Sequence, residues 1–507
     1  MNLRAVGRML GTVLLLLAGF MVLPALVGIA HGEVSEATDI SIAAAMTAAV
    51  GGVLRFLNTS RGEGEHRRPD FFRREGLTVV GLSWVVSGIA GALPYLLSGP
   101  LYDPVDAFFE SVSGFTTTGS TVMSGEQIDG MSKTIAFWRS FTHWLGGFGI
   151  VMVFVVLFPT GGRSLFRSEI PGIAREAGHQ RVRDSALMLM RIYLGISAME
   201  WVLLMTVGGM GAFDAALHTF GTIATGGFSN YSSSIAYFDS VPVEVILTVF
   251  MFICGFNFAL YDTLLRVGPR PFWRSLLGST EVKAYVSIVV GAIFILAAWL
   301  YFTTAAPDEH LDLAGRSRDY RSWWQSVRDT SFTVVCLQTS TGYGTANFDD
   351  WPQGARVLCM FLAVIGACAG STGGGIKVVR ILIIAKAALV GVQRFARPRA
   401  IHAVRMDGQT LDAGIVGSVT SYFALWILVF LGTTLLLTSF DLDLESAATA
   451  TLATLNNIGP GLSAVGPSMN FAELNPIAKL VLSGCMILGR LEFYALVVLF
   501  LPSFWRK

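Results

Sequence analysis

The sequence predicts an all-α polytopic membrane protein: four tandem units of span, half-crossing loop and span, preceded by two further spans. Three observations predict this class. The 507-residue chain is 53% hydrophobic and 14% charged, with a mean hydropathy of +0.60, which is too apolar for a soluble protein of this size. Apolar runs long enough to cross a bilayer recur along the chain. Four similar polar, glycine-containing segments lie between pairs of these runs.

A window of about 20 residues, the length that crosses the hydrocarbon core as a helix, finds ten apolar segments. They lie near 9–30, 39–57, 77–99, 134–159, 185–209, 242–265, 282–304, 353–388, 413–440 and 475–502. The first follows Arg4 and Arg8, as a signal peptide core would. It is longer than such a core, however, and no small-residue cleavage site follows it. We therefore expect a retained span.

Basic residues decide the expected orientation. They gather in four alternate loops: Arg61, Arg67, Arg68, Arg73 and Arg74; Arg163, Arg167, Arg175, Arg181 and Arg183; Arg266, Arg270, Arg274 and Lys283; Arg394, Arg397, Arg399 and Arg405. The loops between them lean acidic, as in HGEVSEATD and DLDLE. Because basic loops stay on the cytoplasmic side, we expect these loops and both termini in the cytoplasm. The outer loop 305–330 is the exception, because it holds four arginines among its acids.

Other classes receive little support. The net charge of +1 argues neither for nor against an acidic partner, and no basic stripe interleaved with aromatics indicates nucleic acid. The five cysteines are odd in number, lie in apolar stretches and show no CxxC spacing, so we expect buried small hydrophobes rather than disulfides or a metal site. An enzyme is not indicated, since there is no HExxH, no GxSxG and no pair of carboxylates at membrane depth.

The four polar segments align without gaps. They read DAFFESVSGFTTTG (106–119), DAALHTFGTIATGG (214–227), DTSFTVVCLQTSTG (329–342) and SAATATLATLNNIG (446–459), with 13 residues from the first residue to the final glycine in each. A single such loop between spans is usually only a linker. Four copies on the same expected side favour one shared pore instead. The sequence thus predicts ten spans and four re-entrant pore helices around one central pore.

Each copy has the pattern of a helix followed by a break. The expected helix caps are Asp106, Asp214, Asp329 and Ser446. A helix of about ten residues is about 15 Å long, half the hydrocarbon thickness, so it enters the membrane but cannot cross it. Entering from outside, it turns the partial negative charge of its C-terminus to the membrane middle, which favours a cation.

The residues after each helix are the candidate cation site. Their carbonyl oxygens can replace the hydration shell of a monovalent cation, as rings of carbonyls do in potassium filters, and glycine permits the backbone angles of such a turn. The candidate potassium ligands are Thr117, Thr118, Gly119, Thr225, Gly226, Gly227, Ser340, Thr341, Gly342, Asn457, Ile458 and Gly459.

The segment GACAGSTGGGIK, residues 366–377, places five glycines near the middle of the long span 353–388. A phosphate-binding P-loop is excluded in practice, because Lys377 is followed by Val378 rather than Ser or Thr and no soluble strand precedes it. Close packing of helices through small residues is an alternative. We favour a break in the helix, since consecutive glycines hold helical geometry poorly.

Arg490 is the deepest isolated basic residue, with apolar neighbours on both sides. An arginine in a span is costly unless it is paired or faces water, so it is a functional candidate. The alternative is an ion pair with Glu492, or with an acid of another span, that only holds the bundle together. Arg139 and His143 are weaker candidates, expected to make structural polar contacts near a span end.

The motifs DAFFESVSGFTTTGST, IATGGFS, TLNNIGPGLS, GACAGSTGGGIKVVRI and LGRLEFYAL resemble the TrkH-type subunits of bacterial Trk potassium uptake systems, in the superfamily that includes the Ktr and HKT transporters. The resemblance covers nearly the whole chain and implies potassium selectivity, because all four filter positions are glycine. The fourth loop departs from the others, with Asn456, Asn457 and Ile458 in place of threonines. The resemblance further implies an intramembrane gate at Gly370, Ser371, Thr372, Gly373, Gly374, Gly375, Lys377 and Arg490.

The same resemblance implies a homodimer in the bacterial inner membrane with a cytoplasmic TrkA-like regulatory subunit, on which a nucleotide (ATP/ADP or NAD) binds. This chain itself is expected to bind no cofactor besides the transported K⁺. The predicted divisions are 1–60 for the two leading spans and 61–160, 161–266, 267–390 and 391–507 for the four pore repeats. The third repeat includes the glycine-rich loop.

The predicted activity is passive or gated potassium entry down the membrane potential. About 2.3 kcal/mol per charge per 100 mV supports about fiftyfold accumulation without chemistry. The alternative is a secondary active symporter that couples Na⁺ or H⁺ to a small solute. Such transporters show inverted repeats and aim helix N-termini at the substrate, whereas the repeats here are parallel and fourfold.

Overall fold

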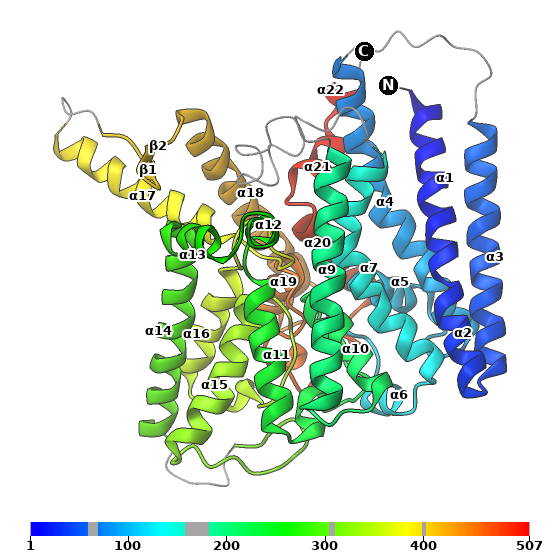
Figure 1. Ribbon diagram of the computed structural model, residues 1–507, viewed down its shortest axis with the longest axis horizontal. Coiled ribbons are helices and arrows are strands. Elements are labelled where there is room, and N and C mark those ends of the chain that lie inside the picture. Colours follow the sequence, from blue (N-terminus) through cyan, green and yellow to red (C-terminus); the bar gives the residue numbers. More distant parts are fainter. Residues whose placement is uncertain (1, 59–68, 158–181, 304–309, 398–401, 506–507) are drawn as a thin grey trace.

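The computed structural model describes residues 2–58, 69–157, 182–303, 310–397 and 402–505 (Figure 1). In these ranges the protein is mostly helical. The two short strands β1 (Arg405–Met406) and β2 (Gln409–Thr410) pair antiparallel in a small hairpin. Helix α1 begins at the same end of the molecule at which α22 lies (Figure 1).

The N-terminal part contains α1 (Leu3–Phe20), α2 (Val22–His31), α3 (Val34–Leu57) and α4 (Pro69–Leu97). Helices α1 and α3 pack through small residues: a Cβ atom on Gly11 would lie 2.6 Å from the carbonyl oxygen of Gly51. Such contacts let helix backbones approach closely, which is how apolar helices associate in a bilayer.

The remaining helices follow in three groups. The first group is α5 (Pro104–Phe115), α6 (Gly125–Asp129), α7 (Lys133–Leu157), α9 (Val182–Thr206), α10 (Ala212–Ile223), α11 (Val241–Cys254) and α12 (Phe258–Val267). The second group is α13 (Pro269–Gly278), α14 (Thr280–Thr303), α15 (Trp323–Gln338), α16 (Gln353–Val364) and α17 (Val378–Ala396). The third group is α18 (Ala413–Thr438), α19 (Leu444–Leu455), α20 (Pro476–Arg490), α21 (Tyr494–Val497) and α22 (Pro502–Trp505). Short 3₁₀ turns lie at Ser234–Phe238, Phe348–Asp350, Ser463–Val465 and Val498–Phe500.

Six helical segments of the described chain are long and apolar enough to cross a membrane. They are Leu3–His31, Val34–Leu57, Arg74–Leu97, Leu187–Thr206, Thr280–Thr303 and Ala413–Thr438. A bent pair, Pro476–Arg490 with Tyr494–Phe500, would make a seventh. The structure therefore agrees with a multi-span membrane protein.

Two of the segments expected as continuous spans are interrupted. The segment 242–265 divides into α11 and α12 at Gly255–Asn257. The segment 475–502 bends by 115° between α20 and α21, where Glu492 and Phe493 both have positive φ. A hydropathy value is averaged over a window of residues, so it does not detect a break of a few residues. The break expected within 353–388 is present, between Val364 and Val378.

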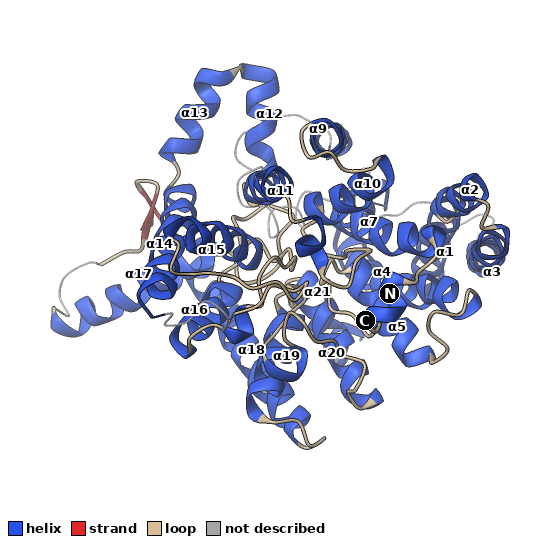
Figure 2. Ribbon diagram, turned by 90° about the horizontal axis from the view of Figure 1, so that it is seen from below, coloured by secondary structure: helices blue, strands red, loops and turns tan. Residues whose placement is uncertain are grey.

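Four short helices, α5, α10, α15 and α19, are buried in the middle of the molecule. When the molecule is seen from below, loops gather at its centre and helices surround them (Figure 2). Two large apolar clusters lie around this centre. One is built mainly on α9 to α16, and the other on α1 to α7 with α19 and α20. The five cysteines are all free and buried, as expected.

Candidate functional site

The four short helices end in the same way. In α5, the backbone N–H of Thr118 donates to the carbonyl of Ser113 (2.9 Å), and that of Thr117 donates to Gly114 (3.1 Å). This pair of bonds is the Schellman motif, which satisfies the last carbonyls of a helix and reverses the chain. The equivalent pairs in the other helices are Gly226 to Gly221 and Thr225 to Thr222, Thr341 to Cys336 and Ser340 to Leu337, and Ile458 to Ala453 and Asn457 to Thr454.

The chain after each helix adopts one repeated backbone conformation. The first residue of each turn is left-handed although it is not glycine: Thr117 (φ 52°), Thr225 (54°), Ser340 (56°) and Asn457 (54°). Two residues later comes a glycine with positive φ: Gly119 (82°), Gly227 (79°), Gly342 (87°) and Gly459 (104°). Non-glycine residues in this region are strained and persist only where their surroundings hold them. Fourfold repetition therefore points to a shared requirement for this shape.

The four turns close into a ring. A Cβ atom on Gly119 would lie 2.2 Å from the carbonyl oxygen of Gly226, which precedes the glycine of the next turn. The same relation joins Gly227 to Thr341 (2.0 Å) and Gly342 to Ile458 (2.0 Å). Gly459 completes the circle against Thr118, at 3.1 Å. Each turn thus packs its glycine against the carbonyl of its neighbour, in chain order around one axis.

A cavity of about 150 Å³ opens on one side of this ring. It is lined by the four glycines and by residues that follow them, such as Ser120, Phe228, Tyr343 and Pro460. Arg139 is the one charged residue among the lining residues. Carbonyls and the C-terminal ends of helices both carry partial negative charge, so this arrangement is chemically suited to a cation.

Arg139 joins two of the turns and is more than a contact at a span end. It pairs with the fully buried Glu110 on α5 (2.7 Å) and donates to the carbonyl of Ser229 (2.7 Å). Its guanidinium also lies 3.6 Å from the centre of the Phe228 ring. Glu110 in turn accepts from the backbone N–H of Val122 (3.0 Å), two residues past the first turn's Ser120. This ion pair ties the first turn to the second.

His143 lies directly behind the second turn. Its Nδ1 is 2.8 Å from the carbonyl oxygen of Gly114, and its ring stacks on Phe228 with centroids 4.1 Å apart. A Cβ on Gly226 would lie 2.4 Å from the His143 ring. The sequence showed both Arg139 and His143, but only the fold shows that they support the ring.

The helix caps predicted from the sequence are wrong. The residues that cap the four short helices are Asp103, Gly211, Ser322 and Asp443. The predicted residues lie within the helices. Asp106, Asp214 and Ser446 are in the first turn, where acids are also favoured, and Asp329 is in the second turn of α15. There Asp214 and Ser446 bind residues that follow their helices, whereas Asp106 pairs with α20 and Asp329 accepts from its own helix. Their partners are Lys479 for Asp106, Asn230 and Tyr231 for Asp214, Gln325 for Asp329, and the backbone of Ala464 for Ser446.

The cap Asp443 stands outside the helix and accepts from the backbone N–H of Ser446 (3.0 Å). Hydrogen bonds from Ser446 lower the pKa of its carboxyl, because they stabilise the ionised form. A carboxylate at this end also suits the positive end of the helix dipole.

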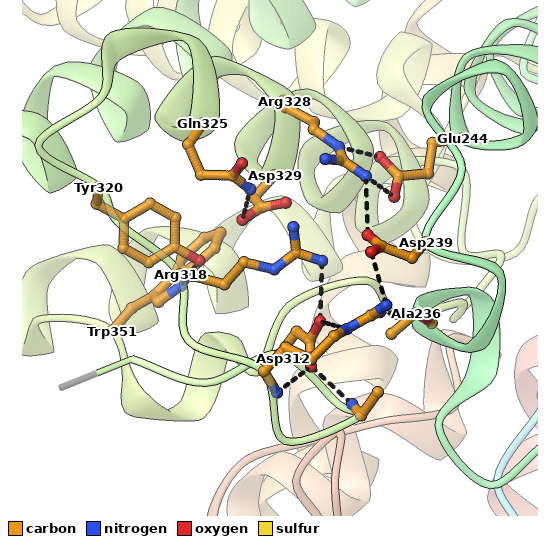
Figure 3. A network of polar contacts seen from close by, with 12 residues as sticks. Ala236, Asp239, Glu244, Asp312, Arg318, Tyr320, Gln325, Arg328, Asp329 and Trp351 are labelled. Atoms are coloured by element: carbon orange, nitrogen blue, oxygen red, sulfur yellow. Dashed lines mark hydrogen bonds and ion pairs between the residues drawn. The ribbon is translucent and has the colours of Figure 1, made fainter. Parts of the chain in front are cut away.

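The arginines of the exceptional loop after α14 are paired with acids of the same loop and of the segment that includes the start of α11 (Figure 3). Asp312 accepts from Arg316 (2.7 Å) and Arg318 (3.0 Å). Arg328 makes two bonds of 2.7 Å to Glu244 on α11. Asp239 lies between these groups, 2.9 Å from Arg316 and 3.7 Å from Arg328. Arg321 pairs with Asp319 (3.2 Å).

The glycine-rich segment lies against the other side of the ring. It runs from the end of α16 to the start of α17. A Cβ on Gly374 would lie 2.4 Å from the carbonyl oxygen of Asn456, and one on Gly373 would lie 2.9 Å from that of Thr339. The N–H of Gly374 donates to the hydroxyl of Ser340 (2.5 Å). The absence of side chains is what lets this segment approach the ends of α15 and α19.

Arg490 binds the same segment from α20. It is 7% exposed and donates to the carbonyl oxygens of Thr372 (2.8 Å) and of Gly146 on α7 (3.3 Å). Lys377, the last residue of the segment, donates to the carbonyl of Gly373, so the segment is in contact with two cationic side chains. The alternative partner Glu492 pairs with Arg380 instead. Of the remaining predicted positions, Gly370 and Gly375 have positive φ. The carbonyl of Gly370, which precedes Ser371, accepts from the backbone N–H of Phe258 (3.0 Å).

Glu281 is a residue at this site that the sequence did not single out. Its carboxylate accepts from the N–H of Ala369 (2.7 Å) at the start of the segment. The N–H of the adjacent Thr280 donates to Asp407 in the β1–β2 hairpin (2.8 Å). The sequence signal, an acid in the first turn of a span, indicates only a favourable helix start.

Comparison with known proteins identifies the family. The family model for TrkH, described as a cation transport protein, matches residues 37–507. The potassium uptake protein TrkH of Salmonella typhimurium is 35% identical over the full length of both chains. The uptake protein TrkG of Escherichia coli K12 is 30% identical over 86% of each. The crystal structure of the potassium transporter TrkH from Vibrio parahaemolyticus superimposes with a TM-score of 0.86 at 33% identity, covering 100% of both chains. The chain belongs to the TrkH family of cation transport proteins.

Proposed function

We propose that this protein takes up potassium ions across the bacterial inner membrane through the ring formed by the four glycine turns. The observation that carries the proposal is the cyclic packing of Gly119, Gly227, Gly342 and Gly459 against the carbonyls of the neighbouring turns. Carbonyls held this rigidly can replace the hydration shell of one cation. The names of the relatives, potassium uptake proteins, support potassium as that cation.

The finer architecture belongs to the same proposal. The chain crosses the membrane ten times, and α5, α10, α15 and α19 are the re-entrant pore helices. The units are 1–60, 61–160, 161–266, 267–390 and 391–507, with both termini in the cytoplasm. Four short helices that turn their C-termini to one ring favour a cation over an anionic solute, which would need helix N-termini. This argues against the coupled symporter of an organic anion.

The ion path follows from the arrangement of charges. Potassium enters the cavity above the ring and binds the carbonyls of Thr118, Gly226, Thr341 and Ile458, with those of Thr117, Thr225, Ser340 and Asn457 and of the four glycines as further ligands. The membrane potential supplies about 2.3 kcal/mol per charge per 100 mV, so entry needs no chemical step. We therefore expect this chain to consume no ATP.

The glycine-rich segment 366–377 is the proposed gate. It lies across the inner side of the ring, and Arg490 holds it there through the carbonyl of Thr372. The charges of Arg490 and Lys377 also repel a cation that leaves the ring. Opening therefore requires the segment, with these charges, to move aside.

A cytoplasmic TrkA-like subunit that binds a nucleotide is the proposed regulator, and the transporter is a homodimer. The arginine-rich cytoplasmic loops are the expected docking surface. The loop arginines 61, 67 and 68, and 163, 167, 175 and 181, lie outside the described residues. The hairpin β1–β2 follows another basic loop and reaches the gate segment through Thr280 and Glu281.

Cation flux into proteoliposomes tests the proposal, with potassium compared to sodium for the wild type, Gly119→Ser and Gly195→Ser. Gly195 is the matched control, because a Cβ there would meet nothing within 4 Å. We expect potassium-selective flux that Gly119→Ser weakens and Gly195→Ser leaves intact. Inserted, folded protein that passes neither cation without an organic co-substrate would contradict the proposal and favour the symporter.

A further inference from the structure

Glu200 on α9 is a fully buried carboxyl group, with 0% of its surface exposed. Neither of its oxygens has a hydrogen-bond partner, donor or acceptor, among the described residues. Glu110 is equally buried, but it has Arg139, Thr121 and a backbone N–H as donors. A buried ionised carboxylate without a partner is strongly unfavourable and takes up a proton instead. Glu110 therefore has the donors that a buried carboxylate needs, whereas Glu200 requires a proton in their place.

The surroundings of Glu200 show where such a proton would point. Its carboxyl lies near the hydroxyl of Thr222 in the last turn of α10, without a hydrogen bond between them. That hydroxyl already donates to the carbonyl of His218 (2.8 Å), so its oxygen offers only lone pairs. A carboxylate also offers only lone pairs. Two acceptors that face each other are satisfied when the carboxyl carries the proton and donates it to Thr222.

Among the described residues, the titratable groups that interact directly with Glu200 carry no positive charge. They are Tyr193 on α9 itself, Cys254 on α11 and Tyr343 in the turn after α15. From α10, His218 turns its ring to the backbone of Asp214 and to Ser229. From α7, the contact to α9 is made by Trp144, whose carbonyl accepts from Tyr193 and whose indole donates to Ser197.

Glu200 is connected to two of the four turns through this contact. The carbonyl of His218 that accepts from Thr222 also accepts from the hydroxyl of Tyr343 (3.0 Å), which directly follows Gly342. Thr222 itself accepts the Schellman bond from Thr225 in the second turn (3.0 Å). If Glu200 lost its proton, the Thr222 hydroxyl would turn to the new carboxylate and leave His218. A negative charge would then stand behind the second and third turns.

We propose that Glu200 is a proton-binding site behind the ring, occupied as the carboxylic acid that donates to Thr222. Its release is coupled to the ring through Thr222, His218 and Tyr343. The coupling part of this inference rests on the proposed function, whereas the proton site does not. An ionisable residue inside a span is a functional candidate by default, and here the candidate ligand is the proton.

Infrared spectroscopy of the purified protein at about pH 7, where a free glutamate is ionised, tests the site without any transport. We expect the wild type to show the carbonyl stretch of a protonated carboxylic acid that Glu200→Gln lacks and Glu110→Gln retains. Thr222→Val should keep this band but shift it, because the acid loses its acceptor. Identical spectra of the wild type and Glu200→Gln would overturn the proposal.

Thermal unfolding gives an independent readout. The folded protein holds a proton that the unfolded chain releases above about pH 4.3, so Glu200 stabilises the fold less as the pH rises. Relative to Glu200→Gln, the unfolding constant of the wild type should increase about tenfold per pH unit from about pH 5 up to the pH at which the infrared band of Glu200 is lost. Parallel pH dependences of the two proteins would contradict a bound proton.

Potassium uptake as a function of pH tests the coupling. A charge behind the ring strengthens cation binding, so the apparent potassium affinity of the wild type should rise as the pH passes the value at which the infrared band of Glu200 is lost, and that of Glu200→Gln should not. If the infrared band is present but both proteins respond equally to pH, the coupling is refuted and the proton site stands. If the band is present and no potassium passes in any variant, the proposed function fails instead.

Discussion

The Cα atom of Gly342 in the third turn packs against the carbonyl oxygen of Ile458 in the fourth, so that a Cβ atom would lie 2.0 Å from that oxygen. Backbone atoms cannot yield as a flexible side chain can. The glycines of the ring are therefore required by their neighbours as well as by their own φ angles.

Replacing Gly342 by Ser should impair the ring far more than replacing Gly459 by Ser. A Cβ atom on Gly459 would lie 3.1 Å from the carbonyl oxygen of Thr118. Both variants carry the strain of a positive φ, about 1–2 kcal/mol. Only Gly342→Ser also displaces a carbonyl. We expect Gly342→Ser to lose most potassium flux or selectivity and Gly459→Ser to retain a larger share. Equal tolerance at both positions, measured as the potassium-to-sodium flux ratio, would be inconsistent with the packing described.

Breaking the buried pair of Glu110 and Arg139 should destabilise the protein by about 3–5 kcal/mol, because the remaining charge is left buried without a partner. Glu110→Gln, followed by thermal unfolding in detergent, measures this. The control is Arg321→Gln, which breaks the exposed pair with Asp319 and should cost at most about 1 kcal/mol. A similar small effect of both variants would show that Arg139 does not hold the turns together.

Replacing Arg490 by Ala should increase potassium leak through the protein without its regulator. The change removes the bond that holds Thr372 and a positive charge beside the path. Arg394→Ala on the exposed end of α17 is the control, since the hydrogen bond of its side chain within the described part of the chain is to the backbone of His402. An unchanged leak in Arg490→Ala, measured by flux into proteoliposomes, would refute the gating role.

The N-cap of α19 should make the stability of the protein depend on pH in the acid range. Since the pKa of Asp443 is lowered in the folded protein, its contribution is present above the unfolded value of about 3.9 and is lost as the pH falls through the folded value. Asp443→Ala should destabilise the protein by about 1 kcal/mol near neutral pH. Asp443→Asn should keep the cap and lose its acid dependence. Wild type and Asp443→Asn with the same acid midpoint would speak against this account.

Much of the fold could be predicted from the sequence because its signals are local and repeated. Hydropathy indicated the spans, and the alignment of the four segments placed equivalent glycines that the structure brings into one ring. The break after Val364 followed from consecutive glycines. Cap positions failed because a Ser or Asp is favoured at several places in the first turn, so that composition alone does not choose between Asp103 and Asp106.

The contacts that support the site could not be predicted, because they join residues distant in the chain. Arg139 and Glu110 are 29 residues apart, and Arg490 and Thr372 are 118 apart. Nothing in the sequence pairs Arg380 rather than Arg490 with Glu492. Glu200 looked like an ordinary residue of an apolar span, and only its complete burial without a donor made it distinctive.

The most direct test of the central claim is to locate the cation. Crystals grown with thallium, which substitutes for potassium and scatters anomalously, should show a peak on the axis of the ring. The account predicts that the carbonyl oxygens of Thr118, Gly226, Thr341 and Ile458 surround that peak. A peak held by side chains elsewhere, with none at the ring, would contradict the account.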